Sequence, residues 1–437
     1  MIEKTHGLEA PPWGRKARSG AAARSVGLEQ LALAIWGSPS RAALLSAIVY
    51  ASVVVVFNPT GLGQGLNPFF VYLADALLHG QLALVHVPPV SIDLIHYQDR
   101  YYLYWPPFPA LLFVPLVAAF GLGVSDMLVA LGVAALDVGL VSLLLRDLHE
   151  RGIVDLPVSR RAWLTAFFAF GTVHLPLALR GHASYTAQIV AFAMLCGAYL
   201  AAVRLPGRRG AVLAGAMLGC ALLSRTTIVL AGFWAIWHIA KAGGRTNRRS
   251  AAGLAAAGLA PVALALASLA LYNYLRFGAP SEMGLAYLRM NPRIADDLVQ
   301  HGAFSLHYLP ANLYYHFVSV PYLALLGLRP EMEFWMGGSL FLMSPTFLLA
   351  VVGMIRHWDS DGRVLAVSCS AGLLPALLWL SSGWVEFGPR FTLDITVPLL
   401  IATALGASQV STRFLSRLCV VSMLMYLPGS VMLARVL

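Results

Sequence analysis

Acidic side chains in one polar, aromatic stretch of the chain could remove a proton from a hydroxyl group. Asp75 lies in the segment YLADALLHGQL, and Asp93 precedes a tyrosine-rich tract that starts at Tyr97. A carboxylate in a partly dry loop has a raised pKa, which suits a general base. We expect Asp75 to be the first candidate for this role and Asp93 the second. The structural alternatives are a solvated charge on a helix for Asp75 and a loop-capping carboxylate for Asp93.

Three arginines could bind a phosphate group, because a guanidinium stays charged near lipid and matches phosphate with paired hydrogen bonds. Arg225 lies at a turn between two apolar runs, and Arg276 follows two tyrosines at the end of another run. Arg390 has an acidic residue four positions before it, Glu386, and another four positions after it, Asp394. This spacing favours an internal ion pair, and a substrate-binding Arg390 tuned by that pair is the alternative. For Arg225 and Arg276 the alternative is a side chain that anchors the chain at a membrane interface.

Other polar residues give weaker indications. His182 and Tyr185 could form hydrogen bonds to a polar substrate, although a lone histidine is more often structural. Asp99 and Arg100 are typical of a surface pair. Asp137 stands in the middle of an apolar run, where we favour a bond to a neighbouring helix over a functional role. The sequence contains no HExxH, EF-hand, Walker or Ser-His-Asp spacing, so motifs predict no metal ligands.

The composition identifies the kind of scaffold that must position these residues. The chain has 437 residues, of which 59% are hydrophobic and 11% charged. Soluble domains carry about 25% charged residues, so a soluble enzyme and a disordered regulator are both excluded. The four cysteines lie in or beside apolar runs without a CxxC pair, which argues against a disulfide framework or a zinc site. The net charge of +10 comes without a basic face, and we expect no nucleic-acid partner.

Apolar runs long enough to approach the thickness of a bilayer predict an all-α polytopic membrane protein with about eleven transmembrane helices. The runs are 42–57, 127–145, 162–179, 186–203, 211–223, 226–240, 251–271, 338–355, 364–380, 391–407 and 418–433. A further run, 109–121, is too short to cross and is predicted to be a re-entrant or surface-lying helix.

Basic residues flank these runs asymmetrically, which predicts the orientation. Most arginines and lysines fall into segments that lie on one side if the N-terminus is cytoplasmic and the C-terminus is outside. We therefore expect a multi-pass protein of the cell (inner) membrane, with a basic cytoplasmic tail, 1–41, and a single transmembrane domain, 42–437. Two long outer segments result, 58–126 and 272–337, with short outer loops near 180–185, 224–225 and 381–390. Sites tend to form on such outer loops over a rigid frame.

Several motifs resemble membrane glycosyltransferases of the GT-C fold, such as protein O-mannosyltransferases, aminoarabinose transferases and oligosaccharyltransferase catalytic subunits. They are YLADALLHGQL followed by RYYLYWPPFPALL in the first outer segment, LLSRTTIVL, and WVEFGPRFTLDITVPLL. The second outer segment, with YNYLRFGAPSEMGLAY and FSLHYLPANLYY, is similar to bacterial membrane proteins of this type. The resemblance covers about residues 45–405.

This resemblance implies transfer of a sugar from a polyprenyl-phosphate donor to a lipid, glycan or protein acceptor in contact with membrane lipids. The substrate-binding residues it suggests are Asn67, Arg100, Tyr101, Tyr102, His182, Arg225, Arg276, Glu386 and Arg390, beside catalytic Asp75 and Asp93. These enzymes usually carry an acidic pair where this chain has Leu66-Asn67. Some of them need a divalent metal and others do not, and the sequence leaves that cofactor open. A transporter of lipid-linked precursors and a catalytically degenerate relative are the alternatives.

Overall fold

A computed structural model describes residues 30, 32–244, 247–383 and 386–436. The expected cytoplasmic tail therefore lies, up to residue 29, outside the described residues. The described chain is mostly helical, as predicted, and its strands form two small sheets of two strands each.

Seven helical stretches are long and apolar enough to cross a bilayer within the described residues. They are α2 (Pro39–Phe57), α5 (Asp126–Glu150), α8 (Ala183–Arg204), α11 (Arg248–Phe277), Trp358–Leu378 with α17 (Arg363–Leu378), Arg390–Ala407 with α18 (Thr396–Ala407), and Thr412–Arg435 in α19 (Thr412–Val436). The multi-pass prediction is thus confirmed, but eleven spans are not.

The other four predicted runs form helices that are short or broken. They are α6 (Val158–Phe170) with α7 (His174–Ala178), α9 (Gly207–Leu222), the 3-10 turn Thr226–Gly232 with α10 (Phe233–Gly244), and α15 (Leu340–Met343) with α16 (Leu348–Arg356). At 1.5 Å per residue, the 16 residues of α9 reach about 24 Å, less than a bilayer core of about 30 Å. Pro345 lies two residues after the end of α15 and begins a separate 3-10 turn.

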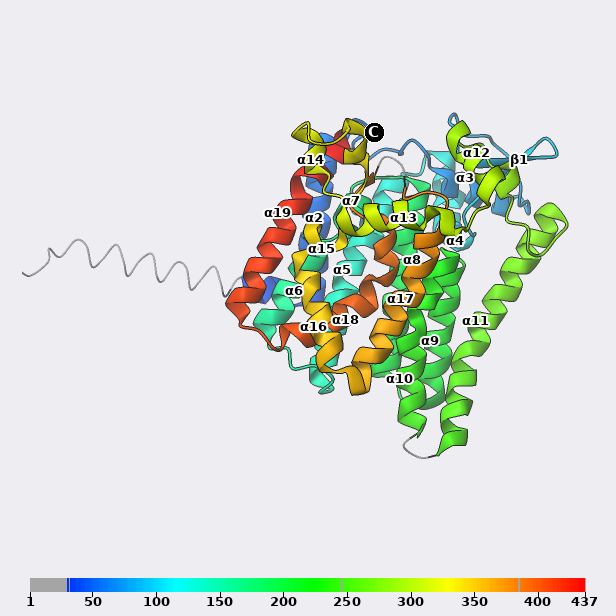
Figure 1. Cartoon of the computed structure of the whole chain (residues 1–437). Helices are drawn as coiled ribbons and strands as arrows, with labels where there is room; N and C mark the ends of the chain where they lie inside the picture. The colour runs from blue at the N-terminus through cyan, green and yellow to red at the C-terminus, as the bar shows by residue number, and fades with distance from the viewer. Residues whose placement is uncertain (1–29, 31, 245–246, 384–385, 437) are drawn as a thin grey trace, which may run out of the picture.

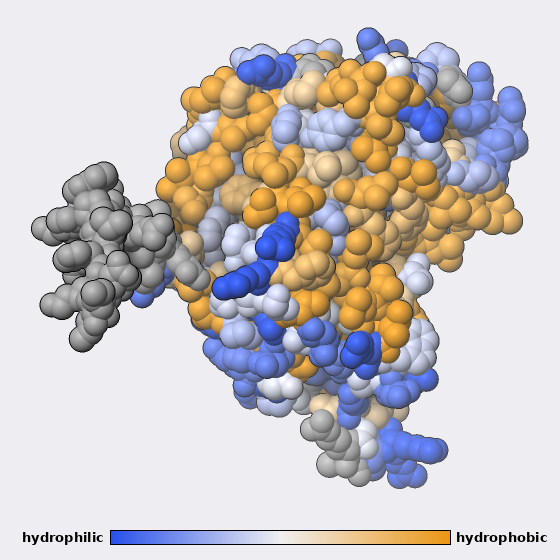
Figure 2. Space-filling model, turned by 60° about the vertical axis from the view of Figure 1, so that its left-hand side comes forward, coloured by the Kyte–Doolittle hydropathy of each residue, from blue (hydrophilic) through white to orange (hydrophobic). Residues whose placement is uncertain are grey.

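Two stretches lie at the centre of the helical assembly. In α8, 89% of the apolar window is buried, and in Arg390–Ala407 the share is 94%, whereas it is 22% in α2 and 17% in α11. The outer surface carries a broad apolar band with hydrophilic residues gathered toward its ends (Figure 2). The central stretches are therefore shielded by the helices around them, and both start at the same end of the molecule.

The two ends of the assembly differ in the way that the sequence predicts. The end of α10 and the start of α11 lie at the lower end, whereas β1, α3, α12, α14 and the end of α19 lie at the upper end (Figure 1). The two long segments predicted to be outside thus share one end. Their assignment to the non-cytoplasmic side stays a prediction.

The first long segment contains α3 (Phe69–Leu78), the hairpin β1 (Leu94–Tyr97) and β2 (Arg100–Leu103), and α4 (Phe108–Phe120). The hairpin turns at Gln98 and Asp99, which both have positive φ, 50° and 56°. The 13-residue α4 begins where Phe108 N donates to the carbonyl of Leu223. This short helix agrees with the prediction that 109–121 does not cross the membrane.

The second long segment packs against the first. It contains α12 (Pro292–His301), α13 (Leu309–Leu313) and α14 (Tyr322–Leu325), and β3 (Met336–Gly337) pairs in parallel with β4 (Glu386–Phe387). Asp93 N donates to the carbonyl of Arg289, and Arg289 N donates to the carbonyl of Leu94. These bonds fix Asp93 between the two outer segments.

Candidate functional site

The chain before α3 lies against the loop before α8. A Cβ added at Gly65 would stand 1.8 Å from the carbonyl oxygen of Gly181, so this close approach requires glycine. The Asp126 carboxylate accepts from Gly65 N at 2.7 Å and fixes this approach from the start of α5. The result places Asn67 beside His182.

Asn67 and His182 form a buried polar pair. Asn67 Nδ2 and His182 Nε2 are 2.8 Å apart, and His182 Nδ1 accepts from Ser184 N at 3.2 Å and lies 2.9 Å from Ser184 Oγ. Burial, together with the nearby charges of Arg180 and Arg390, lowers the pKa of His182 to about 3. The imidazole is therefore neutral at physiological pH. Because Nδ1 accepts from Ser184 N, Nε2 carries the hydrogen, and the Asn67 amide must turn its oxygen toward Nε2 to accept it. These contacts cap α8, so Asn67 and His182 hold the start of a central helix.

Three arginines, Arg180, Arg225 and Arg390, approach one another at the outer ends of the central helices, and we call them the arginine group. They come from the three short loops predicted to be outside, which are far apart in the sequence. Arg180 and Arg390 both pack on the ring of Tyr185, at 5.1 and 5.5 Å. Arg225 and Arg390 both pack on the ring of Phe391, at 4.9 and 4.8 Å. Two aromatic rings therefore connect the three guanidinium groups.

Arg225 pairs with Asp394. Arg225 Nε donates to Asp394 Oδ2 at 2.6 Å, and Gln188 Nε2 donates to Asp394 Oδ1 at 3.3 Å. The sequence spacing had favoured Arg390 as a partner for Asp394, but Asp394 instead pairs with Arg225, 169 residues away in the sequence. The Arg225 side chain remains 19% exposed, so it can contact a ligand while Asp394 holds it.

Arg390 pairs with Glu386, as one of the predicted spacings indicates. Arg390 Nε lies 2.5 Å from Glu386 Oε2, and Arg390 Nη1 donates to Ser184 Oγ at 3.0 Å. Burial raises the pKa of Glu386 to about 8, although Arg390 and Arg225 oppose the shift. Because Glu386 is partly protonated at neutral pH, it cancels only part of the positive charge of Arg390. The arginine group thus keeps an excess of positive charge.

Asp93 is the carboxylate that faces this positive charge without a side-chain ion pair among the described residues. It is half-buried and has a φ of 66°, a left-handed conformation that few residues other than glycine adopt. Burial raises the pKa of Asp93, and the charge of Arg390 partly opposes this. Burial likewise raises the pKa of Tyr104 to about 12, with Arg225 opposing and Asp93 adding to the shift. Asp93, Tyr104 and two arginines therefore share one electrostatic neighbourhood.

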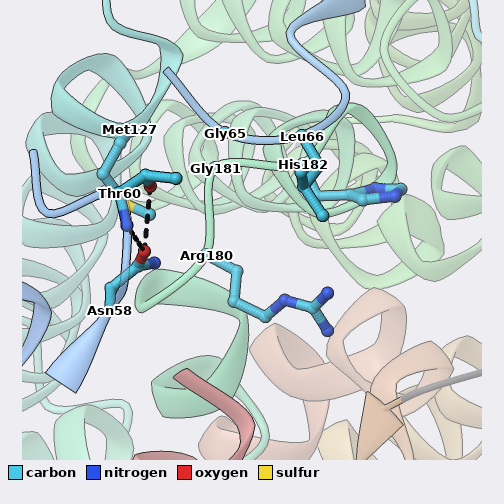
Figure 3. Close-up of a pocket in the computed structure, with 8 residues that line it drawn as sticks. All are labelled: Asn58, Thr60, Gly65, Leu66, Met127, Arg180, Gly181 and His182. Atoms are coloured by element: carbon cyan, nitrogen blue, oxygen red, sulfur yellow. Dashed lines mark hydrogen bonds between the residues drawn. The ribbon is translucent and has the colours of Figure 1, made fainter. Parts of the chain in front are cut away.

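A small hollow lies behind the arginine group. It is lined by Asn58, Thr60, Gly65, Leu66, Met127, Arg180, Gly181 and His182, and its volume of about 10 Å³ suits one water molecule (Figure 3). The side chain of Arg180 extends away from Asn58 and Thr60 in this view. A sugar phosphate is far larger than this hollow, so a substrate would have to contact the exposed sides of Arg225 and Arg390.

Asp75, the first candidate base, has a different environment. Its Oδ2 lies 2.9 Å from His86 Nδ1, and its Oδ1 lies 3.6 Å from His79 Nδ1. Among the described residues no ion pair connects Asp75 with the arginine group. Of the two candidate bases, Asp93 is the one whose pKa responds to the charge of Arg390, and the catalytic roles of both Asp75 and Asp93 stay predictions.

The remaining predicted binding residues stabilise the outer hairpin. Arg276 donates to the carbonyl of Leu103 and to Asn273 Oδ1, both at 2.8 Å, and packs on Tyr272 at 3.9 Å. Tyr102 is buried against Phe277, Tyr101 accepts from Arg289 at 3.4 Å, and Arg100 is exposed beside Asp99 at the turn. A substrate-binding role for Arg276, Arg100, Tyr101 and Tyr102 is not supported by contacts with the arginine group and stays a prediction.

Asp137 is buried inside the helical assembly, where its Oδ2 lies 3.3 Å from His174 Nε2. His174 Nδ1 in turn lies 3.5 Å from the hydroxyl of Tyr50, which donates to the carbonyl of Ala169 at 2.8 Å. The favoured interpretation of a bond to a neighbouring helix agrees with these contacts.

Sequence reasoning missed two members of this neighbourhood, Arg180 and His316. His316 is 1% exposed, its Nδ1 donates to the carbonyl of Asn312 at 2.8 Å, and its ring stacks on Phe391 at 6.0 Å. Burial lowers the pKa of His316 to about 4, so its Nε2 is an acceptor at neutral pH. Arg180 could have been found as a charge in the short outer loop that contains His182. No local pattern distinguishes His316 in the tract NLYYHF.

Comparison with known proteins gives matches only among solved structures. No family model and no curated protein matches the chain. The structure is similar to ArnT from Cupriavidus metallidurans bound to undecaprenyl phosphate, with a TM-score of 0.46, 15% identity and coverage of 86% of this chain and 61% of that one. It is also similar to the Archaeoglobus fulgidus oligosaccharyltransferase, with a TM-score of 0.45, 15% identity and coverage of 90% and 52%.

A further structure of this archaeal oligosaccharyltransferase, AglB with an inhibitory peptide and a dolichol-phosphate, gives a TM-score of 0.42 at 14% identity and covers 90% of this chain and 55% of that one. The chain thus spans about half to three fifths of the length of the structures that it resembles.

Proposed function

We propose that the chain is a membrane glycosyltransferase that moves a sugar from a polyprenyl-phosphate donor to an acceptor hydroxyl at the outer face of the membrane. The acceptor is a lipid, a glycan or a protein. The arginine group binds the phosphate of the donor, and Asp93 receives the proton of the acceptor. The lipid chain of the donor extends into the bilayer beside the central helices.

One observation carries this proposal: Arg225 and Arg390 pack on the same aromatic ring, each partly exposed, close to a half-buried carboxylate with a raised pKa. A phosphate needs several donors with positive charge, and guanidinium groups supply both. The stretches α8 and Arg390–Ala407 also begin here, and the positive end of a helix dipole favours an anion. Glu386 carries little negative charge at neutral pH and neutralises Arg390 only in part. The remaining positive charge also supports the binding of a phosphate.

The transfer breaks the bond between the sugar anomeric carbon and the phosphate oxygen. The acceptor oxygen forms the new bond to that carbon, its proton passes to the Asp93 carboxylate, and the electron pair of the broken bond stays on the polyprenyl phosphate. The developing charge on the departing phosphate is stabilised by Arg225 and Arg390, which are held in place before the reaction starts. A base with a raised pKa accepts the proton more readily at neutral pH.

The carboxylates described around the arginine group do not fit a divalent metal. Asp394 and Glu386 are each paired with a guanidinium, which leaves Asp93 as one oxygen ligand where magnesium or calcium needs several. The proposed transfer therefore uses no metal step at this site.

The test is transfer of a labelled sugar from a polyprenyl phosphate by the full chain in lipid nanodiscs. We expect Asp93→Asn and Arg225→Gln to lose transfer, and Arg329→Gln, an exposed outer arginine that packs on Tyr314, to keep it. Asp75→Asn decides between the two candidate bases. If Asp75→Asn loses transfer while Asp93→Asn stays active, Asp75 is the base. Donor binding without turnover by the unchanged chain would instead support a degenerate relative and overturn the proposal.

A further inference from the structure

A separate group of side chains in the second outer segment has the chemistry of a metal site. Asp297, His301 and His307 each offer one ligand atom, and these three atoms all lie within 4.8 Å of one another. No other set of three such ligands lies this close within the described residues. We call these three residues the His–Asp cluster. It contains no member of the arginine group.

The backbone brings the cluster together from two elements. Asp297 and His301 are four residues apart on α12, so they lie on one face of that helix. The chain turns at Gly302, with a φ of 76°, and the next 3-10 turn, Leu306–Tyr308, returns His307 to the ring of His301. The two rings stack with their centroids 3.7 Å apart. The turn therefore serves to place His307 over the end of α12.

Two anchors hold this turn in place. The hydroxyl of Tyr308 donates to the carbonyls of Asp297 and Gly302, at 3.0 and 2.8 Å, and so fixes the end of α12. The backbone of Ser305 donates to the carbonyl of Leu378 at the end of α17, and Leu380 donates back to the carbonyl of Ala303. The ligands thus project from a backbone that is tied to the helical assembly, which limits the cost of ordering them on binding.

The donor set selects the kind of ion. Two imidazoles and one carboxylate suit zinc and similar transition metals, whereas magnesium and calcium prefer oxygen ligands. A tetrahedral zinc with bonds of about 2.0–2.1 Å has ligand atoms roughly 3.4 Å apart, so the cluster must close by about 1.4 Å at most. The stacked rings must also open, because the lone pairs of imidazole lie in the ring plane. His307 is exposed, and rotation about its χ2 torsion is broad and inexpensive.

We propose that Asp297, His301 and His307 bind one divalent transition-metal ion, of which Zn²⁺ is the probe, and that the ion clamps the end of α12 to the segment that follows it. Three protein ligands leave a fourth position for water. The segment continues through α13 to His316 beside Phe391, so the clamp steadies one wall of the neighbourhood of the arginine group. This inference does not depend on the proposed sugar transfer.

The test is titration of Zn²⁺ into the untagged full chain in nanodiscs after treatment with EDTA, followed by calorimetry. We expect one Zn²⁺ per cluster and at least a tenfold weaker affinity in His301→Gln, His307→Gln and Asp297→Asn. His86→Gln is the matched control, because His86 lies outside the cluster and its Nδ1 is 2.9 Å from another aspartate, Asp75. Unchanged affinity in His301→Gln and His307→Gln, or loss of binding in His86→Gln alone, would overturn the proposal.

A second measurement on the unchanged chain keeps the proposal testable if a variant fails to fold. Chemical modification of histidines, mapped by mass spectrometry, should be slowed by Zn²⁺ at His301 and His307 and not at the exposed His96. Excess Mg²⁺ should give no protection. Equal modification of His301 and His307 with and without Zn²⁺ contradicts the proposal.

Discussion

Replacement of Arg390 by glutamine separates its contact with substrate from its ion pair within the protein. Arg390 is 16% exposed and touches Glu386, Ser184, Tyr185 and Phe391. If one guanidinium hydrogen bond to a phosphate is lost, the cost is about 1.5–3 kcal/mol, which corresponds to about 10- to 100-fold weaker binding of the donor.

The same substitution also leaves Glu386 without its partner. A buried carboxylate left charged and unpaired would cost about 3–5 kcal/mol, so Glu386 takes up a proton instead. The pKa of Glu386 is already raised to about 8 while Arg390 opposes the shift, so it rises further in Arg390→Gln. Because the folded-state pKa lies above the value of about 4.3 in an unfolded chain, stability is lost as the pH rises past that lower value. The single variant should therefore unfold more easily at pH 8 than at pH 6.

The double variant Arg390→Gln, Glu386→Gln removes this pH-dependent loss, because no carboxyl group is left to ionise. It should still bind polyprenyl phosphate 10- to 100-fold more weakly than the unchanged chain. The assay is equilibrium binding of polyprenyl phosphate in nanodiscs, together with thermal unfolding at both pH values. A double variant that binds the lipid phosphate as tightly as the unchanged chain would refute a phosphate-binding role for Arg390.

Three further predictions concern the base and the loop contact. Asp93→Asn should lower the transfer rate by about 10²- to 10⁴-fold and leave donor affinity unchanged, and a parallel loss of affinity would argue against a base. In the unchanged chain the transfer rate should fall as the solution becomes acidic, at a pH above the pKa of an ordinary aspartate, because burial raises the pKa of Asp93. In Arg390→Gln the residual rate should fall at a still higher pH, because Arg390 opposes that rise. A fall at lower pH in Arg390→Gln would contradict the assignment. Gly65→Ala should destabilise the protein by about 1–3 kcal/mol in reversible unfolding, since its Cβ meets the Gly181 carbonyl, and unchanged stability would show that the two loops can separate freely.

The sequence was most informative where a single segment decides the outcome. Apolar runs predicted every long helix, because a segment in hydrocarbon must satisfy its own backbone hydrogen bonds. The short length of 109–121 predicted a helix that does not cross the membrane, and α4 has 13 residues. Eleven spans are not confirmed, because hydropathy does not register that a run such as 338–355 is divided at Pro345.

The site was predictable in part. Arg225, Arg390, Glu386 and His182 were identified from residue type and from their position at the ends of apolar runs, and they lie together. Their partners were harder to predict, because Arg225 and Asp394 are close in space but 169 residues apart in the sequence. His316 could not be predicted, because its burial against Phe391 depends on residues that are distant in the sequence.

The most direct test of the central claim is a structure of the chain in a lipid nanodisc with polyprenyl phosphate bound. The account predicts the phosphate within hydrogen-bonding distance of Arg225 and Arg390, with the Asp93 carboxylate facing the same space and the lipid chain leaving toward the bilayer. A phosphate bound elsewhere, with Arg225 and Arg390 still closed on Asp394 and Glu386 alone, would contradict it.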